Sequence, residues 1–64
     1  MERVRIVYHQ LRESQIWTYD GEILSVLGTG GLRWYPYPKA FSKDIWEHII
    51  NLPKVSDEVE IYYI

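Results

Sequence analysis

Polar and apolar residues alternate near the start of the chain. Between residues 3 and 8, the side chains of Val4, Ile6 and Tyr8 fall on one side, and both arginines fall on the other. A period of two is typical of a strand with one buried face. We therefore predict a first strand over residues 3–8.

Two segments rich in β-branched and aromatic residues follow, over residues 15–19 and 22–27. They flank the pair Asp20-Gly21. An Asp-Gly pair favours a two-residue type I′ turn, because both positions of that turn need a positive φ. The pattern predicts a β-hairpin closed by a two-residue turn.

Glycines and prolines interrupt the pattern next. Residues 28–31 contain three glycines, which predict a loop. Residues 32–35 predict a short further strand, but Pro36 and Pro38 lack the N–H that a central strand donates. We expect an edge strand whose pairing stops near Tyr35.

A helix is predicted over residues 43–51. Ser42 suits the N-cap position, and Asp44 suits the first turn, where the helix dipole favours a carboxylate. Phe41 and Trp46 have the spacing of a hydrophobic staple. Together these residues predict where the helix begins.

Four apolar residues recur at the spacing that forms one stripe of this helix. They are Ile45, Trp46, Ile49 and Ile50. Leu52-Pro53 is expected to end the helix, because proline removes a helical N–H. Alternation returns over residues 58–64, with the glutamates opposite Val59, Ile61 and Tyr63. We predict a final strand there.

These elements predict the α+β class. We expect a small antiparallel sheet of about four to five strands, in the order β-β-β-(β)-α-β, with one helix packed on one face. Residues 1–64 are expected to form a single small domain, because a chain of 64 residues supports one core at most. The pattern leaves the strand order open. Opposite charges at their exposed positions favour placing the first and last strands side by side.

Composition narrows the class of protein. Hydrophobic residues make up 47% of the chain and charged residues 25%, as in ordinary globular domains. The net charge of -2 argues against a duplex-binding protein, and the lack of cysteine excludes disulfides. No apolar run approaches the roughly 18 residues that span a bilayer. We expect a soluble, cytoplasmic protein, in the host cytoplasm if it is viral, with no membrane partner.

Few residues suggest catalysis. His9 and His48 are the only histidines, and the serines lie in no nucleophile motif. Asp44 and His48 have i, i+4 spacing, which allows a hydrogen bond on an exposed helix face. The glycine run is not followed by the helix that a phosphate loop needs. We therefore expect no enzymatic activity, no metal site and no cofactor.

The most informative segment interleaves aromatic and basic residues. Arg33, Trp34, Tyr35, Tyr37 and Lys39 lie close together beside two prolines. Three roles fit these rings. They fill the core of a small domain, they anchor a protein partner, or they stack unpaired bases.

The number of aromatic residues favours an exposed role for some rings. Ten aromatic residues and the aliphatic set exceed what one helix can cover on one sheet face. We therefore expect an aromatic surface that binds another protein, whose identity the sequence does not reveal. The predicted partner-binding residues are Arg33, Trp34, Tyr35, Tyr37, Trp17 and Tyr62.

Self-association is expected for the same reason, because a short chain gains stability by burying exposed rings against a second copy. The homodimer would use the uncovered sheet face or the edge formed by residues 59–64. The chain also resembles in general character the stand-alone accessory proteins of phages and mobile elements, many of which inhibit a host protein. We expect such an inhibitor or accessory role, acting by occlusion of a partner. The alternative is a single-stranded nucleic-acid-binding protein that uses the rings with Arg33, Lys39 and Lys43.

Overall fold

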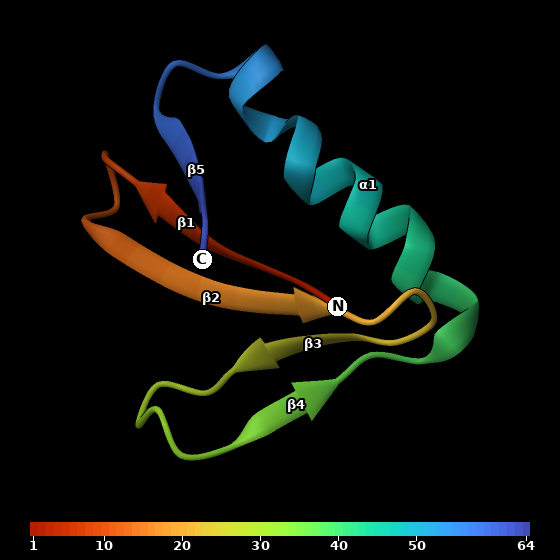
Figure 1. Ribbon diagram of the computed structural model, residues 1–64. Coiled ribbons are helices and arrows are strands. Elements are labelled where there is room, and N and C mark those ends of the chain that lie inside the picture. The colour runs from red at the N-terminus through yellow and green to blue at the C-terminus, as the bar shows by residue number, and fades with distance from the viewer.

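The computed structural model describes all residues, 1–64. It contains five strands and one helix, and it confirms the predicted α+β class (Figure 1). The elements are β1 (Glu2–Tyr8), β2 (Glu13–Tyr19), β3 (Leu24–Leu27), β4 (Trp34–Pro36), α1 (Lys39–Val55) and β5 (Val59–Tyr63).

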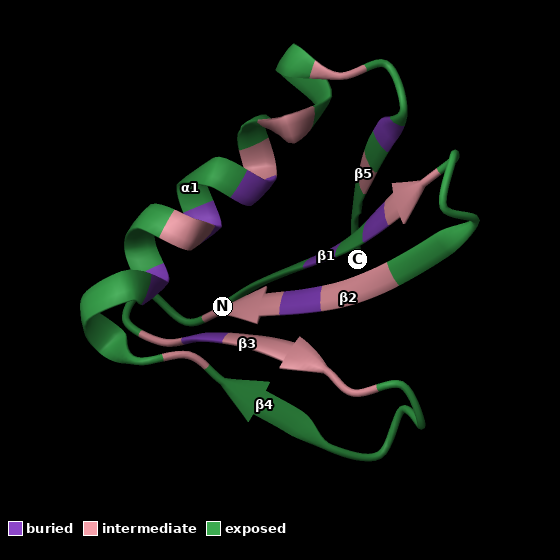
Figure 2. Cartoon of the chain, turned by 180° about the vertical axis from the view of Figure 1, so that it is seen from behind, coloured by how far each residue is buried: buried purple, intermediate pink, exposed green.

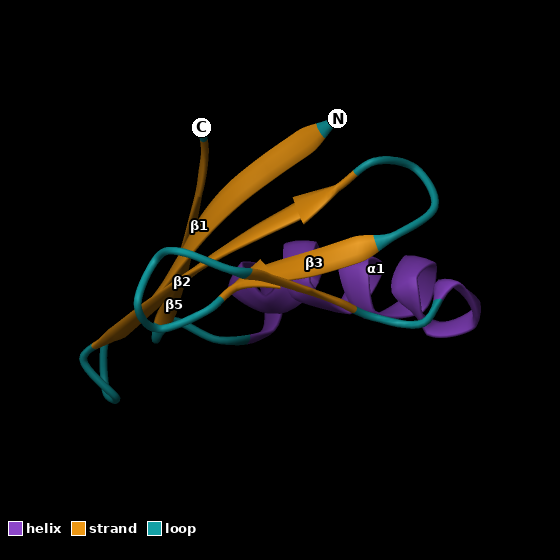
Figure 3. Ribbon diagram, turned by 90° about the horizontal axis from the view of Figure 1, so that it is seen from below, coloured by secondary structure: helices purple, strands orange, loops and turns teal.

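The strands form one antiparallel sheet in the order β4-β3-β2-β1-β5. β1 and β5 are neighbours, with Arg5 opposite Tyr62 and Val7 opposite Glu60, which confirms the predicted pairing of the first and last strands. α1 connects the two edge strands and lies on one side of the sheet (Figure 3). The other side carries no helix.

The core lies between α1 and the helix side of the sheet. Buried positions occur on every strand except β4 and on the inner side of α1 (Figure 2). Two pairs of rings pack there. Tyr19 stacks on Trp46 at 5.5 Å between ring centroids, and Trp17 meets Tyr37 at the same separation. The buried apolar residues are Val4, Ile6, Trp17, Leu24, Trp46, Ile49 and Val59.

The β2–β3 hairpin is present, but its predicted two-residue turn is wrong. Tyr19 pairs with Leu24, so four residues form the turn. The carboxylate of Asp20 accepts hydrogen bonds from the backbone N–H groups of Glu22 and Ile23, at 2.8 and 2.7 Å. Within this turn, only Gly21 has a positive φ, of 100°. The aspartate side chain therefore closes a wider turn than the dipeptide pattern predicts.

The predicted start of the helix is also wrong, because α1 begins at Lys39 after Pro38. Ser42 lies inside the helix and is fully buried. Its Oγ accepts a hydrogen bond from the N–H of Leu24 at 3.0 Å and donates to the carbonyl of Pro38 at 2.9 Å. The hydroxyl thus joins α1 to β3. Phe41 is 60% exposed, so the predicted staple is absent.

The end of α1 lies beyond the predicted one. The helix continues through Pro53 to Val55, and the N–H of Ser56 donates to the carbonyl of Leu52 at 3.0 Å. The apolar stripe is confirmed, because Trp46 and Ile49 are buried and Ile45 and Ile50 are half-buried against the core. Packing of this stripe on the sheet extends the helix past the proline.

β4 is an edge strand, as the prolines predict, but it spans Trp34–Pro36 rather than the predicted residues 32–35. Pro36 lies opposite Ser25 at the end of the β3–β4 ladder. The ring of Tyr35 covers Gly28, where an added Cβ would lie 2.6 Å from Cε2 of that ring. Any larger residue at this position would have to displace the Tyr35 ring.

Candidate functional site

The side of the sheet opposite α1 is called the open face here, and it is the main surface that no other element covers (Figures 1 and 3). The strand register decides which side chains it carries, because neighbours along a strand point to opposite faces. Its larger side chains include Arg3, Arg5, Ile16, Leu27, Trp34 and Tyr62.

A cation–π contact crosses this face. The guanidinium carbon of Arg3 lies 5.2 Å from the centroid of the Trp34 ring, although the two residues belong to β1 and β4. Thr18 of β2 and Ser25 of β3 lie between Arg3 and β4 on this face, and the long Arg3 side chain can extend over them. Both are small. Such a contact contributes about 0.5–1 kcal/mol at an exposed site and fixes the orientation of the ring.

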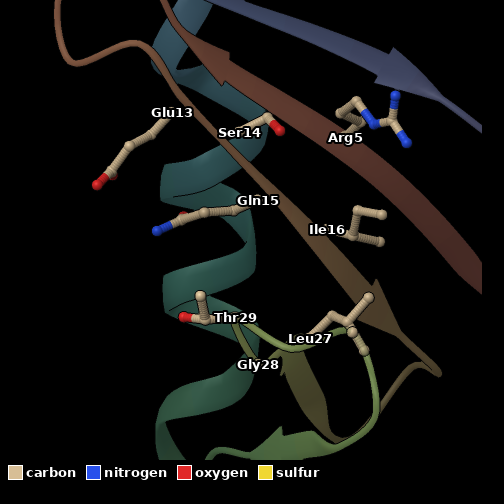
Figure 4. A pocket seen from close by; sticks show the side chains of 9 residues that line it. Arg5, Glu13, Ser14, Gln15, Ile16, Leu27, Gly28 and Thr29 are labelled. Carbon is tan, nitrogen blue, oxygen red and sulfur yellow. The ribbon is translucent and has the colours of Figure 1, made fainter.

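A second row of side chains runs beside this contact. Arg5 lies between Tyr62 of β5 and Ile16 of β2, and Leu27 lies opposite Trp34. Ile16 and Leu27 are half-buried, whereas Tyr62 is 50% exposed. Figure 4 shows Arg5 and Ile16 on neighbouring strands, pointing to the same side. The open face therefore combines apolar side chains with two arginines.

A hydrogen-bonded group occupies the β5 corner of the open face. Glu60 Oε2 lies 2.9 Å from His9 Nε2 and accepts a hydrogen bond from the Tyr62 hydroxyl at 2.9 Å. The hydrogen bond from Tyr62, followed by that from His9, lowers the pKa of Glu60 below its ordinary value. The same carboxylate raises the pKa of Tyr62. Glu60 is thus already engaged, and the arginines dominate the charge of the open face.

The structure separates the six residues predicted to bind a partner. Trp34 and Tyr62 lie on the open face, with Trp34 38% exposed. Trp17 is 7% exposed and belongs to the core, where Tyr37 packs against it. Tyr35 faces the helix side, because it lies opposite Val26.

Arg33, the sixth residue, is exposed in the loop before β4. The two lysines of the alternative nucleic-acid patch lie on α1, away from the open face. Lys39 is 3.7 Å from a carboxylate oxygen of Glu22. The three basic residues of that patch therefore do not share one surface with Trp34.

Four residues of the open face were absent from the predicted site. They are Arg3, Arg5, Ile16 and Leu27. Alternation placed Arg3 and Arg5 opposite the core residues of the first strand, which was a usable signal. The pairing of β4 with β3, which brings Trp34 within reach of Arg3, had no signal in the sequence.

Other candidate chemistry is not assembled. No hydrogen bond or ion pair joins Asp44 to His48, although their spacing allows one. No group of three or more His, Cys, Asp or Glu residues is placed to hold a metal ion. Residues 28–31 turn between two antiparallel strands, with the N–H of Gly31 donating to the carbonyl of Gly28 at 2.9 Å.

One open hollow of about 440 Å³ lies where β2 continues beyond the end of β3 (Figure 4). It is lined by Arg5, Glu13 and Gln15 together with the β3–β4 loop. Glu13 and Gln15 extend to the opposite side from Arg5, so the hollow gathers no cluster of reactive groups. The only helix is too short and too polar to cross a membrane.

Known proteins add no further assignment. The chain matches no protein-family model, no curated protein and no solved structure.

Proposed function

We propose that the protein is a non-enzymatic protein-binding module that acts as a homodimer and occludes a partner protein with its open face. The observation that carries this proposal is the contact between Arg3 and Trp34. It holds a large ring in place on a sheet face that no helix covers.

The composition of the open face supports protein binding. Tryptophan, tyrosine and arginine are the residues that most often dominate binding energy at protein interfaces. A ring that is already oriented loses less conformational freedom on binding than a mobile one. Trp34 meets both conditions, with the half-buried Leu27 beside it.

Charge indicates the chemistry of the partner. Arg3 and Arg5 project from β1 onto the open face, and Glu60 on the neighbouring β5 is engaged by His9 and Tyr62. A complementary surface would present apolar residues flanked by carboxylates. Occlusion of such a surface is the mode of action expected of an inhibitor or accessory protein.

The test is a pull-down with the tagged protein from a lysate of the source organism, carried out with and without nuclease. Trp34→Ala together with Arg3→Ala removes the cation–π pair, and Phe41→Ala removes an exposed ring from α1 as the control. We expect a nuclease-resistant partner that is lost with the first variant and retained with the second. A partner retained by both variants would contradict the proposal.

A second candidate function is the binding of single-stranded nucleic acid. The observation that favours it is the presence of two arginines and two exposed rings on one sheet face, since bases stack on such rings. It predicts quenching of tryptophan fluorescence by oligonucleotides, with an affinity that falls steeply as salt rises. A flat titration at low salt would exclude it.

A further inference from the structure

The two edges of the sheet differ in how they are protected. β4 has three residues, contains Pro36 and is followed by Pro38. Prolines and short length are common devices that prevent a strand edge from pairing with another chain. β5 has five residues and contains no proline, glycine or lysine. Its outer edge is therefore open to a further strand.

The backbone groups of β5 alternate in direction. The N–H of His9 donates to the carbonyl of Glu58 at 2.9 Å, and the N–H of Ile64 donates to the carbonyl of Arg3 at 3.0 Å. In an antiparallel ladder, every second residue bonds to the same neighbour. The even-numbered residues thus bond to β1, and Val59, Ile61 and Tyr63 direct their N–H and C=O groups outward.

We propose that β5 pairs antiparallel with β5 of a second copy, with Ile61 opposite Ile61 on the two-fold axis. This inference rests on the homodimer of the proposed function and specifies its interface. The outward groups of Val59, Ile61 and Tyr63 then all find partners. One sheet runs through both copies.

Charge selects this register over its neighbours. Centring the pair on Ile61 places Glu60 opposite Tyr62 of the second copy and Val59 opposite Tyr63. Centring it on Glu60 would place two glutamates directly opposite each other, which is unfavourable. Centring it on Tyr62 would place the carboxylate of Glu60 opposite the apolar Ile64 of the second copy.

The side chains around the edge are suited to burial. Glu60 already accepts a hydrogen bond from Tyr62 of its own chain, and the second copy brings another tyrosine hydroxyl beside it. On the helix side, Tyr63 is 63% exposed and Val55 at the end of α1 is also exposed. These side chains add apolar area to a strand edge that buries little by itself. We therefore expect the buried area of the interface to be at the low end of the range for specific protein–protein interfaces.

Pairing through β5 leaves the open face free. Side chains that pair across an antiparallel ladder point to the same side of the sheet. The open faces of the two copies would therefore join into one continuous surface, with Trp34 repeated at both ends. Such a surface would engage a partner at two places.

Single-cysteine variants test the register, because the natural chain contains no cysteine. Directly opposed residues have Cα atoms about 4.5–5.5 Å apart, within the range that a disulfide spans. We expect Ile61→Cys to form cross-linked dimers under mild oxidation. Glu60→Cys and Tyr62→Cys should cross-link when mixed with each other and form far fewer dimers alone.

Efficient cross-linking of Glu60→Cys alone, or a monomer mass by light scattering up to hundreds of micromolar, would overturn the proposal. Two substitutions that change the charge at position 62 provide a second test, measured by sedimentation. In the Tyr62→Glu variant, the introduced carboxylate lies opposite Arg5 of its own chain but also opposite Glu60 of the second copy. We therefore expect dimerisation to weaken by about tenfold. Tyr62→Lys should not weaken it, although lysine lies opposite Arg5 within the chain.

The failure of this proposal is distinguishable from the failure of the proposed function. A dimer that persists in Trp34→Ala and cross-links through Cys at position 61 supports the β5 interface, whether or not a partner protein is captured. A dimer that is lost in Trp34→Ala and does not cross-link there would show that the open face is the contact between copies. That result would overturn the β5 interface.

Discussion

The two faces of the sheet are built from the same strands but treat their aromatic residues differently. On the helix side, Trp17 meets Tyr37 and Tyr19 stacks on Trp46 of α1, so each ring is packed against another ring. On the open face, Trp34 is packed against a guanidinium group and stays partly exposed. A tryptophan in a strand is thus core or surface according to what lies over it.

This difference separates stability from binding. The two packed pairs of rings on the helix side exclude water and contribute to the free energy of unfolding. The ring on the open face is held by one exposed contact, which contributes little to stability. Substitutions on the two faces should therefore have very different effects on the fold.

The largest effect is expected for Trp46→Ala. Trp46 is buried and stacked on Tyr19, so its truncation should lower the free energy of unfolding by about 3–5 kcal/mol. In a domain of this size that loss leaves much of the protein unfolded. Urea denaturation followed by circular dichroism would measure it, and a change below about 1 kcal/mol would contradict the assigned core.

Ser42→Ala should have the next largest effect. The variant leaves the buried N–H of Leu24 without its acceptor, which costs about 1–3 kcal/mol. Ser25→Ala on the open face is the matched control and should change stability little. Equal losses in the two variants would show that the bond from Leu24 to Ser42 is not important for the fold.

Trp34→Ala should lower stability by about 1 kcal/mol or less, because it removes an exposed cation–π contact. A double-mutant cycle with Arg3→Ala would isolate the coupling between the two side chains. Unfolding of Trp34→Ala under conditions in which the natural protein is folded would place this ring among the structural residues, contrary to the comparison of the faces.

The smallest effect is expected from acid. Hydrogen bonds from Tyr62 and His9 hold the pKa of Glu60 below its ordinary value of 4.5. Because the folded-state pKa of Glu60 is lowered, its charged carboxylate stabilises the fold at pH values above 4.5. This contribution is lost as the pH falls through the folded-state pKa.

Glu60→Gln should therefore lower stability slightly near neutral pH, where the carboxylate is charged, and leave stability at the acid end almost unchanged, so the variant loses less stability as the pH falls. Urea midpoints measured from pH 6 down to pH 2 would show this. Parallel curves for the variant and the natural protein would contradict the predicted linkage. Asp20, whose pKa is lowered by backbone hydrogen bonds from Ile23 and Glu22, offers the same test at the β2–β3 turn.

Alternation was sufficient to predict which side of several strands is buried. Val4 and Ile6 are fully buried as their spacing indicated, and Arg5 lies on the other side. The helical stripe that includes Trp46 was equally clear. These signals are local, because they depend only on the period of the chain.

Residues with two competing local roles were predicted less well. Ser42 has the chemistry of an N-cap, but the N–H of Leu24 offers a buried donor that no local pattern reveals. Asp20 spans a wider turn than its dipeptide indicates. In both cases a side-chain hydrogen bond shifted the end of an element.

The sequence by itself determined the class of fold, the edge character of β4 and the apolar side of most elements, because periodicity and proline chemistry act over a few residues. Only the tertiary structure decided that Trp17 is core and that Trp34 lies under Arg3. These outcomes depend on strand order and on the path of α1. Both are set by how distant segments pack together.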